Sequence, residues 1–198
     1  FDGRYNWNLW TLYIPASSDV SQQNGAFKIT YTAGKDTTRP EVPSSQQWTV
    51  DKLKYVEADL KLSKFSGSQH ADVHVQVWAN LIGYQWWASC DVSVEPSRPN
   101  TPYYVCHEAR YYGSGTTSNS YSTQSISVTY DSWHKSRIEI DPQTFKVSFY
   151  LGGVLLGANI PADAELLKKT PLRPQIGIYT PGNASFTSHI DNFIVGGR

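Results

Sequence analysis

Between positions 70 and 95, apolar residues alternate with residues suited to binding a ligand. In the first half of this stretch the ligand-binding types are an imidazole, two amides and an indole: His74, Gln76, Trp78 and Asn80. In the second half the same alternation selects an indole, a hydroxyl and a carboxylate: Trp87, Ser89 and Asp91. An indole can stack on the apolar face of a pyranose while directed polar groups bond its hydroxyls. The predicted chemistry is therefore glycan binding.

Two strands joined by a short turn at residues 81–83 would position these side chains. In the first strand every second residue is small and apolar: Val73, Val75, Val77 and Ala79. Strict alternation of this kind indicates one buried face and one presented face. In the second strand we expect Trp87, not Trp86, on the presented face. The alternative is that Trp78 and Trp87 lie under a long loop, such as residues 113–123, as a satellite cluster.

The two cysteines, Cys90 and Cys106, are 16 positions apart. They form no CxxC motif and stand near no cluster of Cys or His, which makes a zinc site a poor interpretation. A disulfide is the better prediction, and closing such a loop contributes on the order of 3 kcal/mol. A disulfide favours an oxidising compartment, so we expect an extracellular or cell-surface protein. Two buried free thiols are the alternative.

The strand expected over residues 103–112 has two possible registers. If Cys106 faces Cys90, Glu108 and Arg110 share that side, although Cys90 itself alternates with apolar residues. This register needs a bulge or a disulfide at the sheet edge. If the apolar residues of the segment face the core instead, Glu108 and Arg110 join the presented face. We expect the second arrangement, which adds Arg110 to the predicted ligand-binding residues.

Length and composition limit the classes of protein. The 198 residues suffice for one substantial domain, so residues 1–198 are predicted to form a single domain. The 17 basic and 17 acidic residues balance, which excludes the basic footprint of a nucleic-acid partner. The sequence contains no run of about 18 apolar residues, so we expect no membrane insertion. The chain begins at Phe1 and contains no Met, so we expect a segment of a longer protein.

Short strand patterns recur along the whole chain. Besides the segments above, alternation predicts strands over residues 26–33, 55–64, 125–130, 135–140, 145–151, 154–156, 175–179 and 188–195. Only residues 163–169 have helical character. Residues 17–25, 34–47 and 113–123 are rich in polar or turn-forming types and are predicted to be turns or loops. Many short strands with Gly, Pro and Asn turns predict an all-β, antiparallel two-sheet sandwich or jelly roll.

Three pieces of sequence resemble the concanavalin A-like (laminin G-like) jelly-roll superfamily. They are the opening FDG followed by Trp7 and Trp10, the strand–turn–strand–turn segment 133–157, and the closing HIDNFIVGG of residues 189–197. The resemblance implies a concave sheet whose outward residues form a groove, and a last strand that pairs beside the N-terminal one. It implies the fold more than a function, because this fold hosts lectins, carbohydrate-binding modules, glycosidases, lyases and adhesion domains.

The resemblance also implies where catalytic acids would stand. Laminarinase-type glycosidases of this fold place carboxylates on one strand with E-x-D-x-x-E or E-x-D-x-E spacing. The nearest match here is Glu57 with Asp59, and the third carboxylate is absent. Glu139 and Asp141 repeat the E-x-D spacing beside a turn. Outward acids on a strand are more often solvent-facing, so we expect no glycosidase site here.

Polysaccharide lyases of this fold use an Arg, Gln, His and Tyr set. His74 with Gln76 is similar to their Q-x-H element, but in reversed order and without a matching R-x-E-x-R strand. We therefore expect a non-catalytic, lectin-like module for a neutral glycan. A glycoside hydrolase or polysaccharide lyase, and a protein-binding adhesion or architectural domain, are the alternatives.

A structural calcium ion is the one metal expectation. Hard oxygen ligands are available at Asp2, Asp191 and Asn192, which approach each other if the first and last strands pair. The alternative is that an Asp at a strand end accepts hydrogen bonds from backbone N–H groups. No other cofactor is expected.

Overall fold

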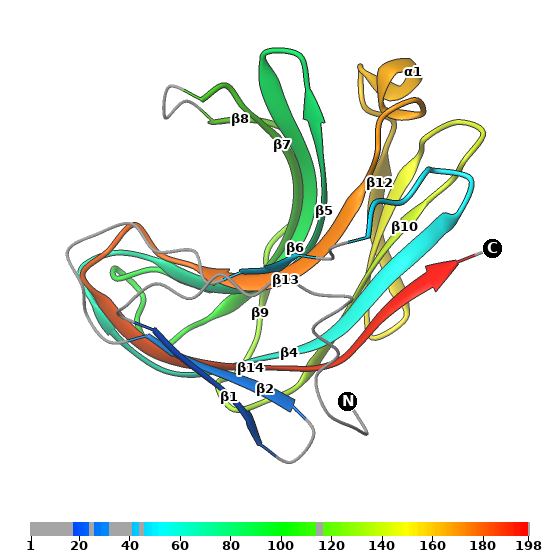
Figure 1. Ribbon diagram of the computed structural model, residues 1–198. Helices are drawn as coiled ribbons and strands as arrows, with labels where there is room; N and C mark the ends of the chain where they lie inside the picture. The colour runs from blue at the N-terminus through cyan, green and yellow to red at the C-terminus, as the bar shows by residue number, and fades with distance from the viewer. Residues whose placement is uncertain (1–17, 24–25, 32–40, 44–45, 114–116, 198) are drawn as a thin grey trace.

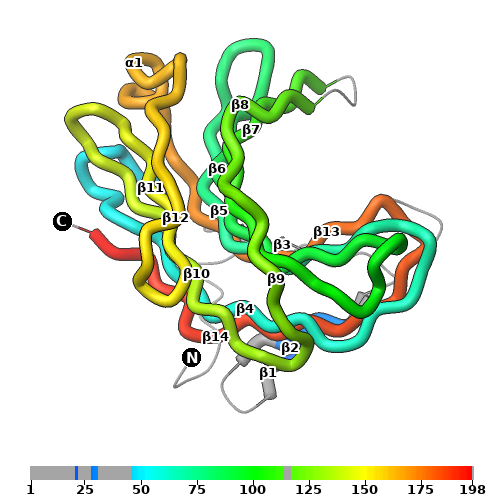
Figure 2. Tube along the Cα trace, turned by 180° about the vertical axis from the view of Figure 1, so that it is seen from behind, coloured from blue at the N-terminus to red at the C-terminus, as the bar shows by residue number. Residues whose placement is uncertain are grey.

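Two antiparallel sheets packed face to face form the described part of the chain, which comprises residues 18–23, 26–31, 41–43, 46–113 and 117–197 of the computed structural model. The back sheet has the strand order β1-β2-β14-β4-β10-β11-β12. The front sheet has the order β3-β13-β5-β6-β7-β8, with β9 also paired to β7. Figures 1 and 2 show the two layers from opposite sides. The predicted all-β two-sheet architecture is confirmed.

The strands of the back sheet are β1 (Ser18–Gln23), β2 (Ala26–Tyr31), β4 (Leu53–Gly67), β10 (His134–Ile140), β11 (Val147–Leu151), β12 (Val154–Asn159) and β14 (Ala184–Gly197). The strands of the front sheet are β3 (Glu41–Pro43), β5 (Ala71–Leu81), β6 (Tyr84–Val94), β7 (Tyr103–Tyr111), β8 (Thr117–Ser122), β9 (Ile126–Ser127) and β13 (Arg173–Tyr179). One short helix, α1 (Ala164–Leu167), precedes β13.

The core lies between the sheets and is built by the predicted alternation. On β5 the apolar set is fully buried: Val73, Val75, Val77 and Ala79. On β4 the corresponding set is Val56, Ala58, Leu60 and Leu62. Trp86 of β6 packs edge-on against Phe145, with ring centroids 5.5 Å apart. Full burial of each large apolar side chain contributes roughly 1.5–3 kcal/mol, so these two strands hold the layers together.

The expected hairpin turns are present. Two residues, Ile82 and Gly83, connect β5 to β6, and Gly83 has a φ of +87°. A turn with positive φ at its second residue favours glycine there, because glycine has no Cβ to clash. At the turn before β11, Asp141 Oδ1 accepts backbone N–H bonds from Gln143 (2.9 Å) and Thr144 (2.8 Å). Both predicted hairpins are therefore confirmed.

Three segments predicted as turns or loops contain strands instead. Residues 17–25 contain β1, residues 34–47 contain β3, and residues 113–123 contain β8. All three strands end the order of a sheet or lie next to its end. An edge strand pairs through its backbone and needs no apolar face, so its polar sequence carries no alternation signal. Conversely, the strand predicted over 125–130 is only the two residues of β9.

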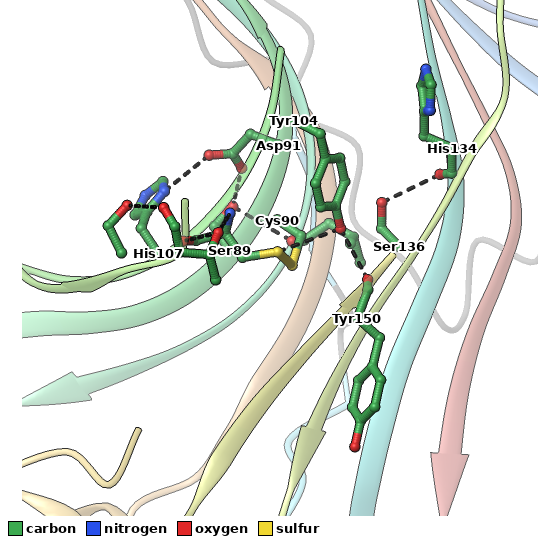
Figure 3. The surroundings of a disulfide bond; sticks show 12 residues. Ser89, Cys90, Asp91, Tyr104, His107, His134, Ser136 and Tyr150 are labelled. Carbon is green, nitrogen blue, oxygen red and sulfur yellow. Dashed lines mark hydrogen bonds and ion pairs between the residues drawn. A yellow bond between two sulfur atoms is a disulfide. The ribbon is translucent and has the colours of Figure 1, made fainter. Parts of the chain in front are cut away.

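The expected register of β7 is wrong. Cys90 and Cys106 are direct cross-strand partners, and no bulge interrupts the pairing of β6 with β7. The predicted disulfide joins them, and both cysteines are fully buried in the core rather than at an edge. Figure 3 shows the disulfide on one side of the front sheet, next to Tyr104, with Ser89, Asp91 and His107 gathered on the other. The presented residues of β7 are therefore those that alternate with Cys106.

This register buries Glu108, which is fully inaccessible. Its carboxylate accepts hydrogen bonds from Ser120 Oγ (2.7 Å) and Asn159 Nδ2 (2.9 Å), which link β7 to β8 and β12. Burying a carboxylate is costly unless it is hydrogen-bonded, and this network satisfies that condition. Because the bonding residues come from distant segments, the sequence pattern alone favoured the wrong face.

Among the described residues, no helix is long and apolar enough to cross a membrane.

Candidate functional site

A cleft of about 360 Å³ lies on the face of the front sheet that points away from the core. Six predicted ligand-binding residues line it: His74, Gln76, Trp78, Trp87, Ser89 and Asp91. The alternation of β5 and β6 therefore brings together the side chains that the sequence indicated. The prediction that Trp87, rather than Trp86, faces this side is also confirmed, because Trp86 is fully buried.

Two predicted residues lie elsewhere. Asn80 is exposed at the end of β5, where its Oδ1 accepts a hydrogen bond from Gln85 Nε2 at 3.0 Å. Arg110 lies on the core side of β7, and its Nε donates to Asp163 Oδ2 at 2.7 Å. Arg110 was selected because of the wrong register, so its assignment to the site is corrected.

Cross-strand pairing arranges the cleft in rows. One row contains Trp78 and Trp87, which are direct partners on β5 and β6. The next row runs across four strands: Gln175, Gln76, Ser89 and His107. The third contains His74 and Asp91 as direct partners. Rows two residues apart are separated by about 7 Å along a strand, so the indoles and the His74–Asp91 row are about 14 Å apart.

The indole row presents a broad aromatic surface. The guanidinium of Arg173 lies 5.2 Å from the Trp78 ring centroid, and the Tyr111 ring centroid is 6.5 Å from that of Trp87. Both indoles line the cleft, so among the described residues they are not a satellite cluster closed off from the surface. From that segment, Thr117 lines the cleft as well. This end of the cleft is suited to stacking against a flat, partly apolar ligand.

His74 is oriented by a carboxylate from its own strand. Its Nδ1 lies 2.8 Å from Oδ1 of Asp72, and the two residues are only 5% and 8% exposed. A carboxylate on one ring nitrogen fixes the tautomer and the direction of the other nitrogen. Asp72 was not selected from the sequence, although it continues the alternation of β5 by one step and this signal was present.

Asp91 is held by two neighbours, Ser89 on its own strand β6 and His107 on β7. Its Oδ2 lies 3.1 Å from His107 Nδ1, and Ser89 Oγ donates a hydrogen bond to its Oδ1. Burial alone would lower the pKa of His107, but the Asp91 carboxylate outweighs burial and raises the pKa. Burial likewise opposes ionisation of Asp91, yet the charge and hydrogen bond of His107 keep its pKa below the ordinary value. The pair is therefore charged over a widened pH range.

The second nitrogen of His107 faces the indole row. Trp87 Nε1 donates to His107 Nε2 across 3.4 Å, which requires a neutral acceptor nitrogen. This bond is long and therefore weak. The Asp91 carboxylate on the other nitrogen therefore has the stronger influence on the protonation of His107. His107 was missed by sequence reasoning because it belongs to the strand whose register was predicted wrongly.

Gln175 and Tyr179 of β13 complete the described wall of the cleft. Tyr179 is the cross-strand partner of Asp72, and its ring centroid is 5.2 Å from that of His70. No local pattern links β13 to β5, since about a hundred residues separate them and only sheet pairing makes them neighbours.

One group of described residues has the spacing of metal ligands: Asp72, His74 and Asp91, whose ligand atoms lie within 4.8 Å of one another. Of the calcium ligands expected from the sequence, Asp191 and Asn192 lie on β14 of the back sheet. Asp2 is outside the described residues, and Asp191 Oδ1 accepts the backbone N–H of Asn192 at 2.7 Å. A calcium ion near Asp191 stays a prediction.

The acids considered for a glycosidase lie on the back sheet. Glu57 contacts Lys135 Nζ at 2.9 Å and Arg137 at 3.6 Å, and Asp59 accepts a bond from Asn192 Nδ2 at 2.7 Å. Neither acid lines the cleft. The specific prediction of the hydrolase alternative, that one of them does, is wrong.

No protein-family model and no curated protein sequence matches this chain. Solved structures do match. An alginate lyase from Pseudomonas aeruginosa superposes with a TM-score of 0.68 at 10% identity, over 98% of this chain and 100% of that one. A laminarinase from Flavobacterium sp. gives 0.59 at 12% identity, over 96% and 95%. A carbohydrate binding module from Bacillus subtilis gives 0.55 at 11% identity, over 93% and 92%. The chain thus has the concanavalin A-like jelly-roll fold.

Proposed function

We propose that this protein is a recognition module that binds a neutral polysaccharide in the front-sheet cleft, at or outside the cell surface. The observation that carries the proposal is the side-by-side pair of indoles, Trp78 and Trp87, in the cleft. Beside them, amide and hydroxyl groups of the next row are available to bond sugar hydroxyls. A hydrophobic platform with a few directed polar groups is the usual composition of a small-ligand site.

Charge supports a neutral ligand. The described residues that line the cleft include two buried carboxylates, Asp72 and Asp91, and no Lys or Arg. An anionic sugar would therefore meet like charges at the cleft floor. The similar structures named above are a lyase of alginate, a laminarinase and a carbohydrate binding module, which supports a carbohydrate as the partner.

The disulfide supports the location. Cys90 and Cys106 are joined across β6 and β7, and such bonds persist mainly in oxidising compartments.

Affinity gel electrophoresis with neutral polysaccharides tests the proposal. Covering one indole with a sugar ring removes apolar surface from water and contributes roughly 1–2 kcal/mol, so Trp78→Ala and Trp87→Ala should each weaken binding about tenfold. Trp133→Ala is the matched control, because Trp133 is 45% exposed and packs against His189 of the back sheet. Unchanged retardation of both cleft variants would show that the indoles do not bind the glycan.

A second function, β-elimination of a uronic-acid polysaccharide, is favoured by one observation. His74 is oriented by Asp72 in a cleft that is also lined by Tyr179. An imidazole held in this way can take the C5 proton of a uronate while a phenol protonates the leaving O4. The C5–H and C4–O4 bonds break, and a C4=C5 double bond forms.

Release of an unsaturated product distinguishes cleavage from recognition. Ultraviolet absorbance is followed while the protein is incubated with a panel of polyuronates, with His74→Gln as the comparison. A rise in absorbance that His74→Gln abolishes would establish the lyase. No rise in absorbance with any polyuronate of the panel, together with binding to a neutral glycan, would establish recognition without cleavage.

The adhesion alternative predicted a flat front sheet covered by residues 34–47 or 113–123. The described part of the front sheet has a cleft instead, lined by polar and aromatic side chains of five strands. No observation in the described residues favours that alternative.

A further inference from the structure

We propose that Asp72, His74 and Asp91 bind a divalent transition-metal ion at the floor of the cleft. Two independent features of the sheet place the three side chains together. Alternation on β5 puts Asp72 and His74 on one face, and the β5–β6 pairing puts Asp91 directly opposite His74. Side chains opposite one another on adjacent strands have Cβ atoms about 5 Å apart, which is close enough to share an ion.

The distances match a metal coordination sphere. Asp72 Oδ1 and His74 Nδ1 are 2.8 Å apart, a separation suited to neighbouring ligands of one ion. Zinc binds nitrogen and oxygen ligands at about 2.0–2.2 Å, which puts the ligand atoms of a tetrahedral ion about 3.4 Å apart. The ligand atoms of the cluster lie within 4.8 Å of one another. Binding therefore requires the side chains to turn toward the ion by up to about 1.4 Å.

The donor set selects the kind of ion. One imidazole and two carboxylates suit Zn²⁺ or Mn²⁺, whereas Ca²⁺ and Mg²⁺ prefer oxygen ligands alone. Three protein ligands on the floor of an open cleft leave further coordination positions facing the ligand side, as in zinc sites that exchange water for substrate.

Asp91 has the outer hydrogen bonds that orient a metal-binding carboxylate. Both of its oxygens are engaged by side chains that come from outside the cluster, Oδ1 by Ser89 and Oδ2 by His107. Ligating carboxylates are oriented in this way by outer hydrogen bonds. Asp91 is 5% exposed, so it is held in a fixed direction at the base of the cleft. Its position therefore does not depend on a mobile side chain.

Electrostatics favours a cation at this position. Asp72 and Asp91 are both more than nine-tenths buried and converge on the same imidazole. Hydrogen bonds from His74, Ser89 and His107 compensate part of the cost of removing the two carboxylates from water. A divalent ion placed between the carboxylates would compensate both charges at once.

The site also extends the proposed function, on which this step rests. The cluster is about 14 Å from the indole row along the strands. One polysaccharide chain can thus stack a ring on Trp78 and Trp87 and direct the hydroxyls of a further ring to the open positions of the ion. Sugar binding would then depend on the metal, whereas metal binding would not depend on the indoles.

Isothermal titration calorimetry of the chelator-treated protein with Zn²⁺ alone, and then with Mn²⁺ or Ca²⁺ alone, tests the site. One Zn²⁺ or Mn²⁺ per chain is expected, with affinity reduced about tenfold or more in Asp72→Asn, His74→Gln and Asp91→Asn. Asp59→Asn on the back sheet is the matched control and should bind as the unaltered protein does. Absence of Zn²⁺ and Mn²⁺ binding, or equal affinity in the cluster variants, would overturn the proposal, as would binding of Ca²⁺ alone.

Two further measurements keep the outcome clear. Should the cluster variants fail to fold, Co²⁺ added to the unaltered protein must give visible absorption bands of a low-coordinate site, and their absence contradicts the proposal. Trp78→Ala must keep metal affinity while losing glycan binding. If no glycan binds at all but Zn²⁺ does, the proposed function fails and the metal site stands. Glycan binding that a chelator leaves unchanged would refute the link between ion and sugar.

Discussion

The outward faces of the two sheets both bury a carboxylate, but they surround it differently. On the back sheet, Glu57 is 6% exposed and lies between Lys135 and Arg137. On the front sheet, Asp91 is 5% exposed and lies beside His107. Lys and Arg keep their charges at all ordinary pH values, so the Glu57 carboxylate on the back sheet stays paired with permanent cations. An imidazole has a charge that responds to its surroundings, so the front-sheet network can exchange partners with a ligand.

Histidines on the two sheets also differ in the direction of their pKa shifts. In the cleft, the Asp91 carboxylate raises the pKa of His107 despite burial. On the back sheet, burial lowers the pKa values of His134 and His189. The comparison indicates that a nearby carboxylate, rather than depth of burial alone, distinguishes the cleft from an ordinary sheet surface.

The largest expected effect concerns the cross-link beneath the cleft. Replacing both Cys90 and Cys106 with Ala opens a loop whose ends are 16 residues apart, and we expect the free energy of unfolding to fall by about 3 kcal/mol. Urea denaturation followed by tryptophan fluorescence measures this change. A loss well below 1 kcal/mol would mean that core packing, and not the cross-link, stabilises the front sheet.

The two buried carboxylates provide the direct test of the comparison. Glu57→Gln and Asp91→Asn should each lower the free energy of unfolding by about 1–2 kcal/mol, because each removes hydrogen bonds to a charged group. Only Asp91→Asn should also weaken glycan binding, since Glu57 is on the opposite sheet. Equal effects of both variants in an affinity gel would contradict the difference between the two faces.

A smaller effect is expected along β5 itself. Gln76→Ala removes one cleft amide, and the loss of one hydrogen bond weakens glycan binding by about 1 kcal/mol, or roughly fivefold. Asn80→Ala is the control on the same strand and the same face, because Asn80 does not line the cleft. Titration of tryptophan fluorescence with glycan measures both. If both variants lose the same glycan affinity, the binding site extends to the end of the β5–β6 hairpin.

The smallest effect concerns the back-sheet histidines. Because burial keeps the folded-state pKa of His134 below the ordinary value of 6.5, the unfolded chain binds this proton first. Stability should then be highest above about pH 6.5 and fall as the pH drops through the unfolded and folded values. His134→Asn with His189→Asn should flatten this decline in urea unfolding series. If the stability of the double variant falls as steeply with pH as that of the unaltered protein, other titratable groups cause the decline.

Much of the cleft was predictable because it lies on one hairpin. The alternation of β5 and β6 placed six of the eight predicted residues correctly, and the two errors have separate causes. Arg110 followed from a register that put the apolar residues of β7 in the core and Glu108 on the presented face. The residues that satisfy the buried Glu108, Ser120 and Asn159, come from other strands. Asn80 was on the correct face but beyond the end of the cleft.

Apart from Asp72, which lies on β5 itself, the missed residues named above come from strands that only the fold brings together. His107 depends on the β6–β7 register, and Gln175 and Tyr179 depend on the pairing of β13 with β5. Edge strands β1, β3 and β8 were missed for a related reason, since backbone pairing imposes no apolar pattern on an edge.

The sequence by itself determined the periodicity, the turns, the cysteine pair and the two faces of the central hairpin, because these depend on residues near one another in the chain. The tertiary structure alone decided which strands are neighbours, on which side of the sheet Cys106 and Glu108 lie, and that His107, Gln175 and Tyr179 join the cleft. These features depend on pairing between distant segments. Such pairing is set by the combined free energy of burying the whole core and of satisfying its few buried polar groups.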